Sequence, residues 1–449
     1  MKHRSRTFGL SIALLIICGF TPWTSRFAIG QDTLRWSQVA DRVLSQTPAV
    51  RKARAELQFA KTLEHLQFGA YLPALSLGFS SSRNEQGPRQ VYLGAEPFEQ
   101  SGQSYFYHST GLNLSYVLFD WGNRHRKSRA FEEQSHSKQW ALVQAQREAL
   151  QEAFSTYCDL LAAQEALQLI EEEQTMLERQ HTLVSRLANR GLQPSVDLKR
   201  VEVEQRNLQA EIYRQRGEMK NNRQTLSSSM DINVSGTAHF APVKVPKDSM
   251  LYGDKSITAI AENAPGIRKQ KMIVHSAQTE ARIIHWEQFP QLSLAASYQR
   301  GNERFPEVYG SLPQNWNTVL SMQLSFSLFN RNTERIQQEK QSLQVSTASW
   351  DLKNQRRQLR LQFQKLLDDY NVQVHQYHLQ QQNVHDYEVI YKYEQEAYQA
   401  GSNEYRDYLS ALRAYVTARQ NAIKIKYQMT KTHFRIELFT GRWDHFAEE

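Results

Sequence analysis

Beyond residue 30 the sequence has no apolar run that approaches the roughly 20 residues a transmembrane helix requires. Its mean hydropathy of −0.64 and its 22% of charged residues indicate that most of the chain meets water. Lipid admits only helices and closed β-barrels, because both satisfy every backbone polar group internally. The chain after residue 30 is therefore expected either to cross a membrane as β-strands or not to cross one at all.

Cysteine is nearly absent, and one of the two cysteines falls in a segment with the features of a secretion signal. Residues 1–30 have a basic start, an apolar run over about 8–20 and a small-residue cleavage site before Gln31, which predicts a signal peptide. Cys18 follows an isoleucine where a lipoprotein signal requires a small residue, so we expect no lipid there. Cleavage leaves Cys158 alone, which excludes an internal disulfide and predicts a packed helical side chain.

The motifs of common catalytic and binding sites are also missing. The net charge of +8 arises in part from the first 30 residues, and no basic patch with interleaved aromatics suggests nucleic acid. We find no nucleophile elbow, phosphate-binding glycine loop or HExxH zinc motif, and therefore expect neither an enzyme nor a cofactor. His375, His378 and His385 share one helical face, but no carboxylate or cysteine completes a ligand set, so we expect no metal site.

What the sequence does contain is an internal duplication. Pro48 and Pro265 begin similar helical stretches 217 residues apart, and Pro73 and Pro290 have the same spacing. Further along, Leu118-Phe119-Asp120 matches Leu328-Phe329-Asn330, and the segments after Gly191 and Gly401 also match, both at an offset of 210. One seven-residue length change between the strands explains both offsets. The period is too long for a solenoid repeat.

Each half reads as a helix, a strand, a loop, a strand and two long helices. The strands are predicted at about 74–83, 110–119, 291–300 and 317–329, joined by polar loops at about 84–109 and 301–316. Every strand alternates between apolar and polar residues, which indicates one apolar face and one polar, water-facing side. The apolar positions expected to face lipid are Leu75, Leu77, Leu112, Leu114, Leu292, Leu294, Leu320, Met322, Leu324 and Phe326.

The predicted helices are far longer than the average of about 11–12 residues. Residues 331–400 contain no proline or glycine, and residues 122–190 contain only Gly122, so each helix would extend about 100 Å. Apolar side chains recur every seven residues, which predicts helices packed lengthwise as in coiled coils. The stripes are Leu142, Ala149, Thr156, Ala163, Ile170, Leu177 and Val184 in the first half, and Phe363, Tyr370, Tyr377, Val384, Tyr391, Tyr398 and Tyr405 in the second.

Four strands with an apolar face cannot close a barrel by themselves, since bacterial barrels need about eight or more. Several chains must therefore contribute to one barrel, from which the long polar helices extend into water. The fold class is accordingly mainly α, with a transmembrane β-barrel portion, four strands per chain and coiled-coil helices.

At this point the sequence resembles a known family, the TolC-type outer-membrane efflux proteins. The resemblance rests on the order of short motifs: Leu72-Pro73-x-Leu75, residues 118–124, Gly191-x-x-x-Ser195-x-Asp197-Leu198, and the second copy of the set. It implies a homotrimer whose twelve strands form one barrel in the outer membrane of a Gram-negative-type bacterium. A periplasmic helical tunnel would continue from the barrel and dock, through an adaptor protein, onto an inner-membrane pump of the RND or ABC type.

The resemblance also implies a gate at the periplasmic tip, formed by the turns at Gly191 and Gly401. Asp407 would contribute one carboxylate to a threefold ring that attracts cations, although an aspartate in a first helical turn also simply favours the helix dipole. Tyr398 would form a latching hydrogen bond with Asp197. The family's second carboxylate is Ser410 here and its arginine after the glycine is Asn403, which argues for weaker selectivity and a weaker latch.

The predicted domains follow from the duplication. Residues 1–30 are the signal peptide; 31–236 are the first repeat, with strands at 74–119 and long helices at 122–236; 237–255 are a linker; and 256–445 are the second repeat, with strands at 291–329 and long helices at 331–445. An outer-membrane export channel is the leading hypothesis. A periplasmic coiled-coil tether without a pore is the alternative, but it leaves the apolar strand faces unexplained. An extracellular trimeric adhesin would place the helices outside the cell.

Overall fold

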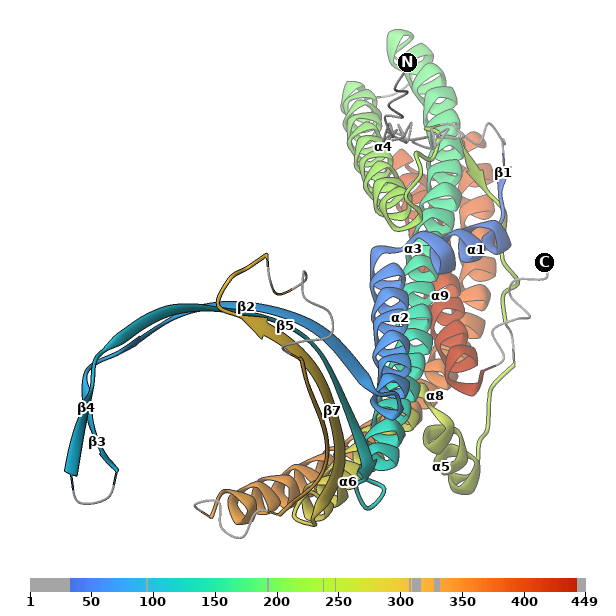
Figure 1. Ribbon diagram of the computed structural model, residues 1–449. Coiled ribbons are helices and arrows are strands. Elements are labelled where there is room, and N and C mark those ends of the chain that lie inside the picture. Colours follow the sequence, from blue (N-terminus) through green and yellow to red (C-terminus); the bar gives the residue numbers. More distant parts are fainter. Residues whose placement is uncertain are drawn as a thin grey trace, which may run out of the picture.

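The computed structural model in Figure 1 is a long helical bundle with a curved sheet leaving one end. It describes residues 33–93, 96–191, 194–236, 238–246, 248–306, 308, 316–326 and 332–441. The predicted signal peptide, residues 327–331 of the last strand and the helix start, and the residues beyond Gly441 lie outside this set. None of the helices in these ranges is long and apolar enough to cross a membrane.

The helices are α1 (Trp36–Gln46), α2 (Pro48–Phe68), α3 (Asn123–Asn189), α4 (Ser195–Met230), α5 (Asp254–Asn263), α6 (Pro265–Trp286), α8 (Thr333–Gln399) and α9 (Tyr405–Thr440). The strands are β1 (Thr33–Leu34), β2 (Ala74–Gln86), β3 (Arg89–Leu93), β4 (Glu96–Gln100), β5 (Gln103–Phe119), β6 (His239–Phe240), β7 (Gln291–Asn302) and β8 (Trp316–Ser325).

The internal duplication predicted from the sequence is confirmed element by element. The helices α3 and α8 each have 67 residues, and α4 and α9 each have 36, with both pairs offset by 210. The shorter helices α2 and α6 both begin with proline, at the offset of 217. The left-handed residues that precede or follow the long helices also recur, as Gly122 with Asn332 and Asp231 with Gly441.

The long helices begin and end where local chemistry dictates. Before α3, the Asp120 carboxylate accepts hydrogen bonds from the backbone N–H groups of Gly122 and Arg124, at 3.2 and 2.8 Å. These bonds satisfy amides that a helix start leaves unpaired. At the other end Gly191 and Gly401 adopt φ of +71° and +76°, which L-residues with side chains disfavour. The uninterrupted polar sequence between these points has no breaker, so the helix continues for its full predicted length.

The four main strands form one antiparallel sheet in the order β2-β5-β7-β8. The two hairpins share one register, because Leu75 opposes Leu114 in the first and Leu292 opposes Leu324 in the second, at the offsets of the repeat. The sheet curves strongly away from the bundle, at the end opposite the α3–α4 turn (Figure 1).

The first hairpin corrects one prediction. Residues 84–109, expected to be a polar loop, are largely strand: β2 runs to Gln86, β5 begins at Gln103, and β3 pairs with β4 between them. The alternation of apolar and polar residues is lost in this segment. The sequence pattern therefore predicts the part of each strand that has one apolar face, and it does not predict the rest of the strand.

The core lies along the helical bundle and follows the predicted seven-residue stripes. Ile170, Leu177 and Val184 on α3 are fully buried, and Tyr391 and Tyr398 on α8 are nearly so. They pack with α4 and α9 into one cluster, while Phe363 and Tyr370 belong to another nearer the sheet. The chain thus stays polar in composition because each helix buries only a narrow stripe.

A third core cluster at mid-length ties the chain start to the bundle. Tyr157 is fully buried on α3, and its hydroxyl donates to one of two carbonyl oxygens, those of Leu34 and Ala241, which lie 2.9 and 2.7 Å away. These carbonyls flank the parallel β1–β6 pair. Cys158 beside it is fully buried, as predicted, and burial raises the pKa of its thiol well above the usual value. The thiol is therefore held in its unreactive protonated form.

Candidate channel surfaces and tip

The sheet carries one continuous apolar face. Residues directly opposite one another in an antiparallel pair share a face, so the register joins Leu75, Leu114, Ala296 and Leu320 into one row. The next row joins Leu77, Leu112, Tyr298 and Thr318. All the strand residues predicted to face lipid belong to this face, and Phe326 follows directly after β8.

On the outer strands, the described part of the chain leaves this apolar face uncovered. Leu75, Leu77, Leu320, Met322 and Leu324 are each about two-thirds exposed or more, at 68, 75, 71, 65 and 68%. The opposite face carries mainly small and polar residues, with a row of Ser76, Asn113, Ser297 and Val319 and another of Gly78, Gly111, Gln299 and Asn317. One side of the sheet is thus suited to lipid and the other to water.

An aromatic cluster at the junction of sheet and helices was not predicted. The Trp121 ring packs edge-on against Phe119 and at a tilt against Phe289, at centroid distances of 5.0 and 5.5 Å. Its indole N–H donates to the carbonyl of Pro290 at 2.7 Å. Such amphipathic rings favour the boundary between lipid and water. The signal was present in the sequence, as aromatic residues just outside the strand ends, but the strand periodicity does not include them.

At the far end of the bundle, the two predicted tip turns have the same construction. Gly191 N–H donates to the carbonyl of Ala188 at 2.9 Å, and Gly401 N–H donates to that of Tyr398 at 3.1 Å. Both glycines would have open space around an added Cβ, so only their positive φ requires glycine.

We expect Gly401→Ala to destabilise the folded protein by about 1 kcal/mol, because a residue with a side chain disfavours the left-handed backbone conformation. No steric clash adds to this cost, since the space around the Cβ position is open. Gly217→Ala is the matched control. Gly217 lies inside α4 with nothing near its Cβ position, so alanine should stabilise the helix by about 0.5–1 kcal/mol. Thermal unfolding in detergent measures both. Equal shifts of the same sign would contradict the backbone explanation.

The two predicted tip aspartates occupy different environments. Asp407 lies in the first turn of α9 with its side chain about half exposed, 3.5 Å from the Arg406 guanidinium. Asp197 is buried in the first turn of α4 and accepts a hydrogen bond from Arg200 at 3.0 Å. Asp407 is thus the aspartate that remains available to solvent and ions, while its place in the first turn also favours the helix dipole.

The latch predicted between Tyr398 and Asp197 stays a prediction, and both residues have interactions in the structure beyond those described next. Asp197 accepts a hydrogen bond from Arg200. The ring of Tyr398 packs against Tyr405 and Tyr408, at 5.5 and 5.6 Å. The side chain predicted as a latch is therefore part of an aromatic cluster.

That cluster contains five tyrosines and forms the core of the tip. Tyr408 is fully buried, and its ring lies 5.6 to 6.0 Å from those of Tyr391, Tyr398 and Tyr405. Tyr391 also stacks on Tyr415 at 5.6 Å. Burial raises the pKa of both Tyr405 and Tyr408 above the usual range, so their hydroxyls stay protonated. Only the heptad positions of this cluster were predicted from the sequence.

A buried carboxyl group beside the cluster was not predicted either. Glu173 on α3 is 7% exposed and, within the described ranges, forms no hydrogen bond or ion pair. Glu204 on α4 lies near it and forms a bidentate ion pair with Arg413 on α9, in which the Nε–H of Arg413 donates to Oε1 of Glu204 at 2.9 Å. Burial and the nearby Glu204 carboxylate raise the pKa of Glu173 to about 7. In the sequence, Glu173 stands in a polar run that reads as a solvated helix face.

For the described residues, no group of three or more histidine, cysteine, aspartate or glutamate side chains is arranged to hold a metal ion. His375, His378 and His385 thus form no such group in this structure.

Comparisons with known proteins match the chain to one family. The outer membrane efflux protein family matches residues 39–230 and 257–442, one segment in each repeat. The curated proteins that were compared give no match.

Solved structures of outer-membrane channels share the fold. The CmeC channel of Campylobacter jejuni is 16% identical, with a TM-score of 0.77, covering 91% of this chain and 86% of that chain. VceC of Vibrio cholerae is 14% identical, with a TM-score of 0.73 and coverages of 91% and 96%. MtrE of Neisseria gonorrhoeae, solved in an open state, is 15% identical, with a TM-score of 0.76 and coverages of 91% and 89%.

The family match spans most of the chain, in two segments that coincide with the two repeats, and it confirms the resemblance seen in the sequence. This protein therefore belongs to the outer membrane efflux protein family, and it has the fold of outer-membrane channels.

Proposed function

We propose that three copies of this chain form one continuous duct, a twelve-stranded barrel in the outer membrane that leads into a helical tunnel across the periplasm. The duct conducts substrates passively, and the energy comes from an inner-membrane pump of the RND or ABC type, joined through a periplasmic adaptor protein. Lipid is the ligand of the outer barrel surface.

The main support for this proposal is that the four-stranded sheet of one chain is open at both edges in the described structure. Its outer strands β2 and β8 are each paired on one side only in the described structure, and its apolar face is exposed along all four strands. A lipid bilayer tolerates neither an open strand edge nor a single sheet without closure. Additional copies of the same chain supply the missing strands and leave the apolar face toward lipid. A periplasmic tether would have no use for this face.

The lipid-facing assignment is tested by placing a charge on either face of one strand. Met322→Arg puts the charge on the apolar face of β8, and Ser321→Arg, the matched control, puts it on the opposite face. A lipid-facing arginine near the bilayer centre costs about 2–4 kcal/mol per chain, so Met322→Arg should strongly reduce the amount of folded protein in outer membranes. Ser321→Arg should assemble normally. Equal assembly of the two variants would favour the tether.

The proposed gate lies at the tip turns of Gly191 and Gly401, where three copies of Asp407 form a carboxylate ring. Supporting this is the exposure of the Asp407 side chain, in contrast to the buried, arginine-bound Asp197. A ring of like charges around a narrow axis attracts cations and repels anions.

We expect Asp407→Asn to reduce the preference of the channel for cations, measured as a shift of the reversal potential in a salt gradient across a planar bilayer. Glu404→Gln is the matched control, because Glu404 is an exposed carboxylate three residues away at the start of the same helix. If Glu404→Gln shifts the reversal potential and Asp407→Asn leaves it unchanged, Asp407 is not part of the gate.

A further inference from the structure

The apolar face of the sheet changes its chemistry at the end far from the helices. There the strand register continues the same face through three further rows, which we call the outer rows. Along the strands they are Phe79 with Thr110, Arg300 and Trp316; then Ser81 with His108 and Asn302; then Arg83 with Phe106. Aromatic and basic side chains thus replace the aliphatic side chains of the preceding rows.

The outer rows begin at the depth expected for a membrane boundary. Pro290, whose carbonyl binds the Trp121 indole, marks the junction with the helices, and Arg300 lies on β7, the strand that follows it. Ten residues of antiparallel strand extend roughly 34 Å. A tilt of about 40° reduces this to roughly 26 Å across the bilayer, close to the apolar band of about 25 Å in outer-membrane barrels. Arg300 therefore lies at the boundary opposite the Trp121 cluster.

The chain after β7 folds back over this part of the face. The Phe305 ring packs edge-on against Phe79 of β2 and His108 of β5, at 5.5 and 5.6 Å. Arg300 is only 8% exposed, whereas Phe79 and Trp316 in the same row are each 56% exposed. Arg300 is thus held under cover at the boundary and differs from a solvated surface arginine.

Two more basic groups lie further out on the same face. The Arg83 guanidinium sits 5.8 Å from the Phe106 ring centre and pairs with Glu85 at 2.5 Å, and both members of the pair are more than half exposed. An exposed pair of this kind contributes little stability and exchanges readily with another anion. In the row between Arg83 and Arg300, the Nδ1 atom of His108 is buried and has no hydrogen-bond partner among the described residues. A buried polar atom of this kind is stabilised by a polar ligand.

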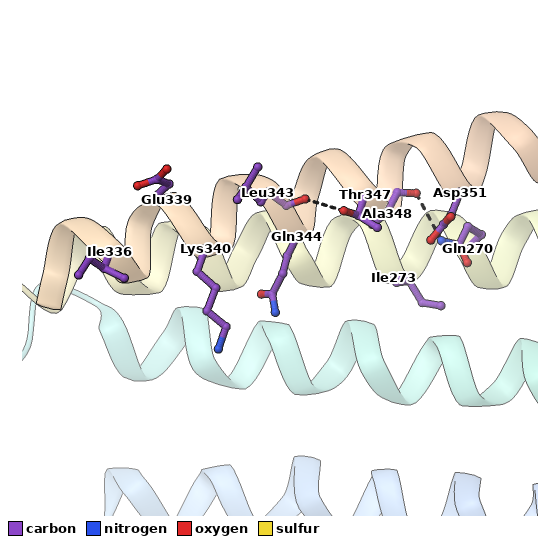
Figure 2. Close-up of a pocket in the computed structure, with 10 residues that line it drawn as sticks. All are labelled: Gln270, Ile273, Ile336, Glu339, Lys340, Leu343, Gln344, Thr347, Ala348 and Asp351. Carbon is purple, nitrogen blue, oxygen red and sulfur yellow. Dashed lines mark hydrogen bonds between the residues drawn. The ribbon is translucent and has the colours of Figure 1, made fainter.

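A groove near the other end of the sheet has the opposite charge. It measures about 550 Å³ and lies between α6 and the start of α8 (Figure 2). Its charged lining residues are Glu339, Lys340 and Asp351. An anionic headgroup would meet two carboxylates and one ammonium group there. The outer rows are therefore better suited to an anion than this groove.

We propose that the outer rows bind lipopolysaccharide, the phosphorylated glycolipid of the outer leaflet. Arg300 binds one phosphate of its lipid A at the membrane boundary, and Arg83 binds a second phosphate further out, with His108 between them. Arginine forms paired hydrogen bonds with phosphate oxygens, and basic clusters at a membrane surface attract anionic headgroups. This inference rests on the proposed channel function, which places the outer rows at the outer leaflet.

The spacing of the two arginines favours a lipid with more than one phosphate. Arg83 lies four residues beyond Phe79, the residue that shares a row with Arg300. Four residues of strand correspond to roughly 14 Å. A phospholipid with a single phosphate reaches only one of the two guanidinium groups, whereas diphosphoryl lipid A reaches both.

Native mass spectrometry of the detergent-solubilised protein tests the site, because one spectrum gives both the number of chains and the number of bound lipids. The wild type should bind up to one diphosphoryl lipid A per chain, and monophosphoryl lipid A and phosphatidylethanolamine should bind more weakly. Arg300→Gln should weaken the binding of diphosphoryl lipid A by about ten-fold or more, as expected for losing a hydrogen bond between charged groups.

Arg126→Gln is the matched control, because Arg126 lies beside tryptophans at the opposite boundary. It donates to the carbonyl of Trp121 at 2.7 Å and sits 4.5 Å from the Trp286 ring centre, so its guanidinium is already engaged. Its replacement should leave lipid A binding unchanged. If Arg300→Gln fails to assemble, Arg83→Gln tests the site on an exposed side chain, and it should weaken binding by about three-fold.

The results distinguish the lipid site from the channel proposal. A trimer whose lipid A binding is weakened by Arg300→Gln or Arg83→Gln, and not by Arg126→Gln, supports both. Binding that neither outer variant weakens, or that Arg126→Gln weakens equally, overturns the lipid site and leaves the channel standing. Equal binding of phosphatidylethanolamine also overturns the lipid site, as does saturation by inorganic phosphate alone. A particle that is not a trimer overturns the channel proposal, whether or not it binds lipid A.

Discussion

Tyr408→Ala is expected to destabilise the tip of the bundle by about 3–5 kcal/mol and to make the channel leaky. Tyr408 is fully buried, and its ring contacts three other tyrosines on α8 and α9. Removing a buried aromatic ring forfeits its apolar burial and leaves a cavity that the long helices can only partly close. Because the cluster joins the two helices that meet at the Gly401 turn, its loss should loosen the proposed gate. Heat-induced loss of helical circular dichroism and single-channel conductance measure the two effects.

Two further variants make this prediction specific. Tyr408→Phe keeps the ring and should retain most of the stability, since it removes only the hydroxyl. Tyr393→Ala deletes a tyrosine from α8 whose side chain is 67% exposed, so its effect should be within about 0.5 kcal/mol of zero. A loss for Tyr393→Ala as large as that for Tyr408→Ala would show that helix composition, not the buried cluster, sets the stability of the tip.

Glu173→Gln is expected to abolish much of the pH dependence of stability between about pH 4.5 and 7. The folded-state pKa of Glu173 is raised from 4.5 to about 7, first by burial and then by the Glu204 carboxylate. Below pH 4.5 the group is protonated in both the folded and the unfolded chain. Between the two pKa values the folded state alone keeps the proton, so stability falls as pH rises and levels off above pH 7. The difference corresponds to about 3 kcal/mol.

Glutamine is uncharged at every pH, so Glu173→Gln should be more stable than the wild type at pH 8 and similar to it at pH 4. Unfolding midpoints across this range measure the effect. Glu178→Gln on the same helix is the control, because Glu178 is exposed and should leave the pH profile unchanged. A wild-type profile that rises from pH 5 to 8 in step with Glu173 ionisation would contradict the assignment. The charged groups facing Glu173 are Glu204 and Glu211 on α4 and Arg413 on α9.

The parts of the fold that could be predicted from the sequence are those encoded by a period. The two offsets, the alternation at residues 320–325 and the seven-residue stripe through Tyr391 and Tyr398 each predicted the correct element. The extension of β2 and β5 beyond the membrane-suited segment could not be predicted this way. In β5 the consecutive aromatic residues Tyr105, Phe106 and Tyr107 interrupt the alternation of apolar and polar residues.

The site predictions were limited for a related reason. Whether Asp197 and Glu173 are buried depends on which helices meet α4 and α3, and that information is not local to either residue. Glu173 stands among polar neighbours and Asp197 between Val196 and Leu198. Both are nevertheless buried, Asp197 beside Arg200 and Glu173 without a hydrogen-bond partner in the described chain. Their environments follow from packing between repeats, which no single helix encodes.

The tyrosine stripe of the second repeat has a consequence for how the two halves can diverge. At the offset of 210, Tyr391 and Tyr405 correspond to His181 and Ser195. Near the tip, the buried stripe of α3 consists of Ile170, Leu177 and Val184, whereas that of α8 consists of Tyr391 and Tyr398. In the proposed trimer, a substitution in one repeat changes three of the six long helical hairpins and leaves the other three unchanged. Duplication therefore allows the aliphatic and the aromatic parts of the tip core to diverge independently.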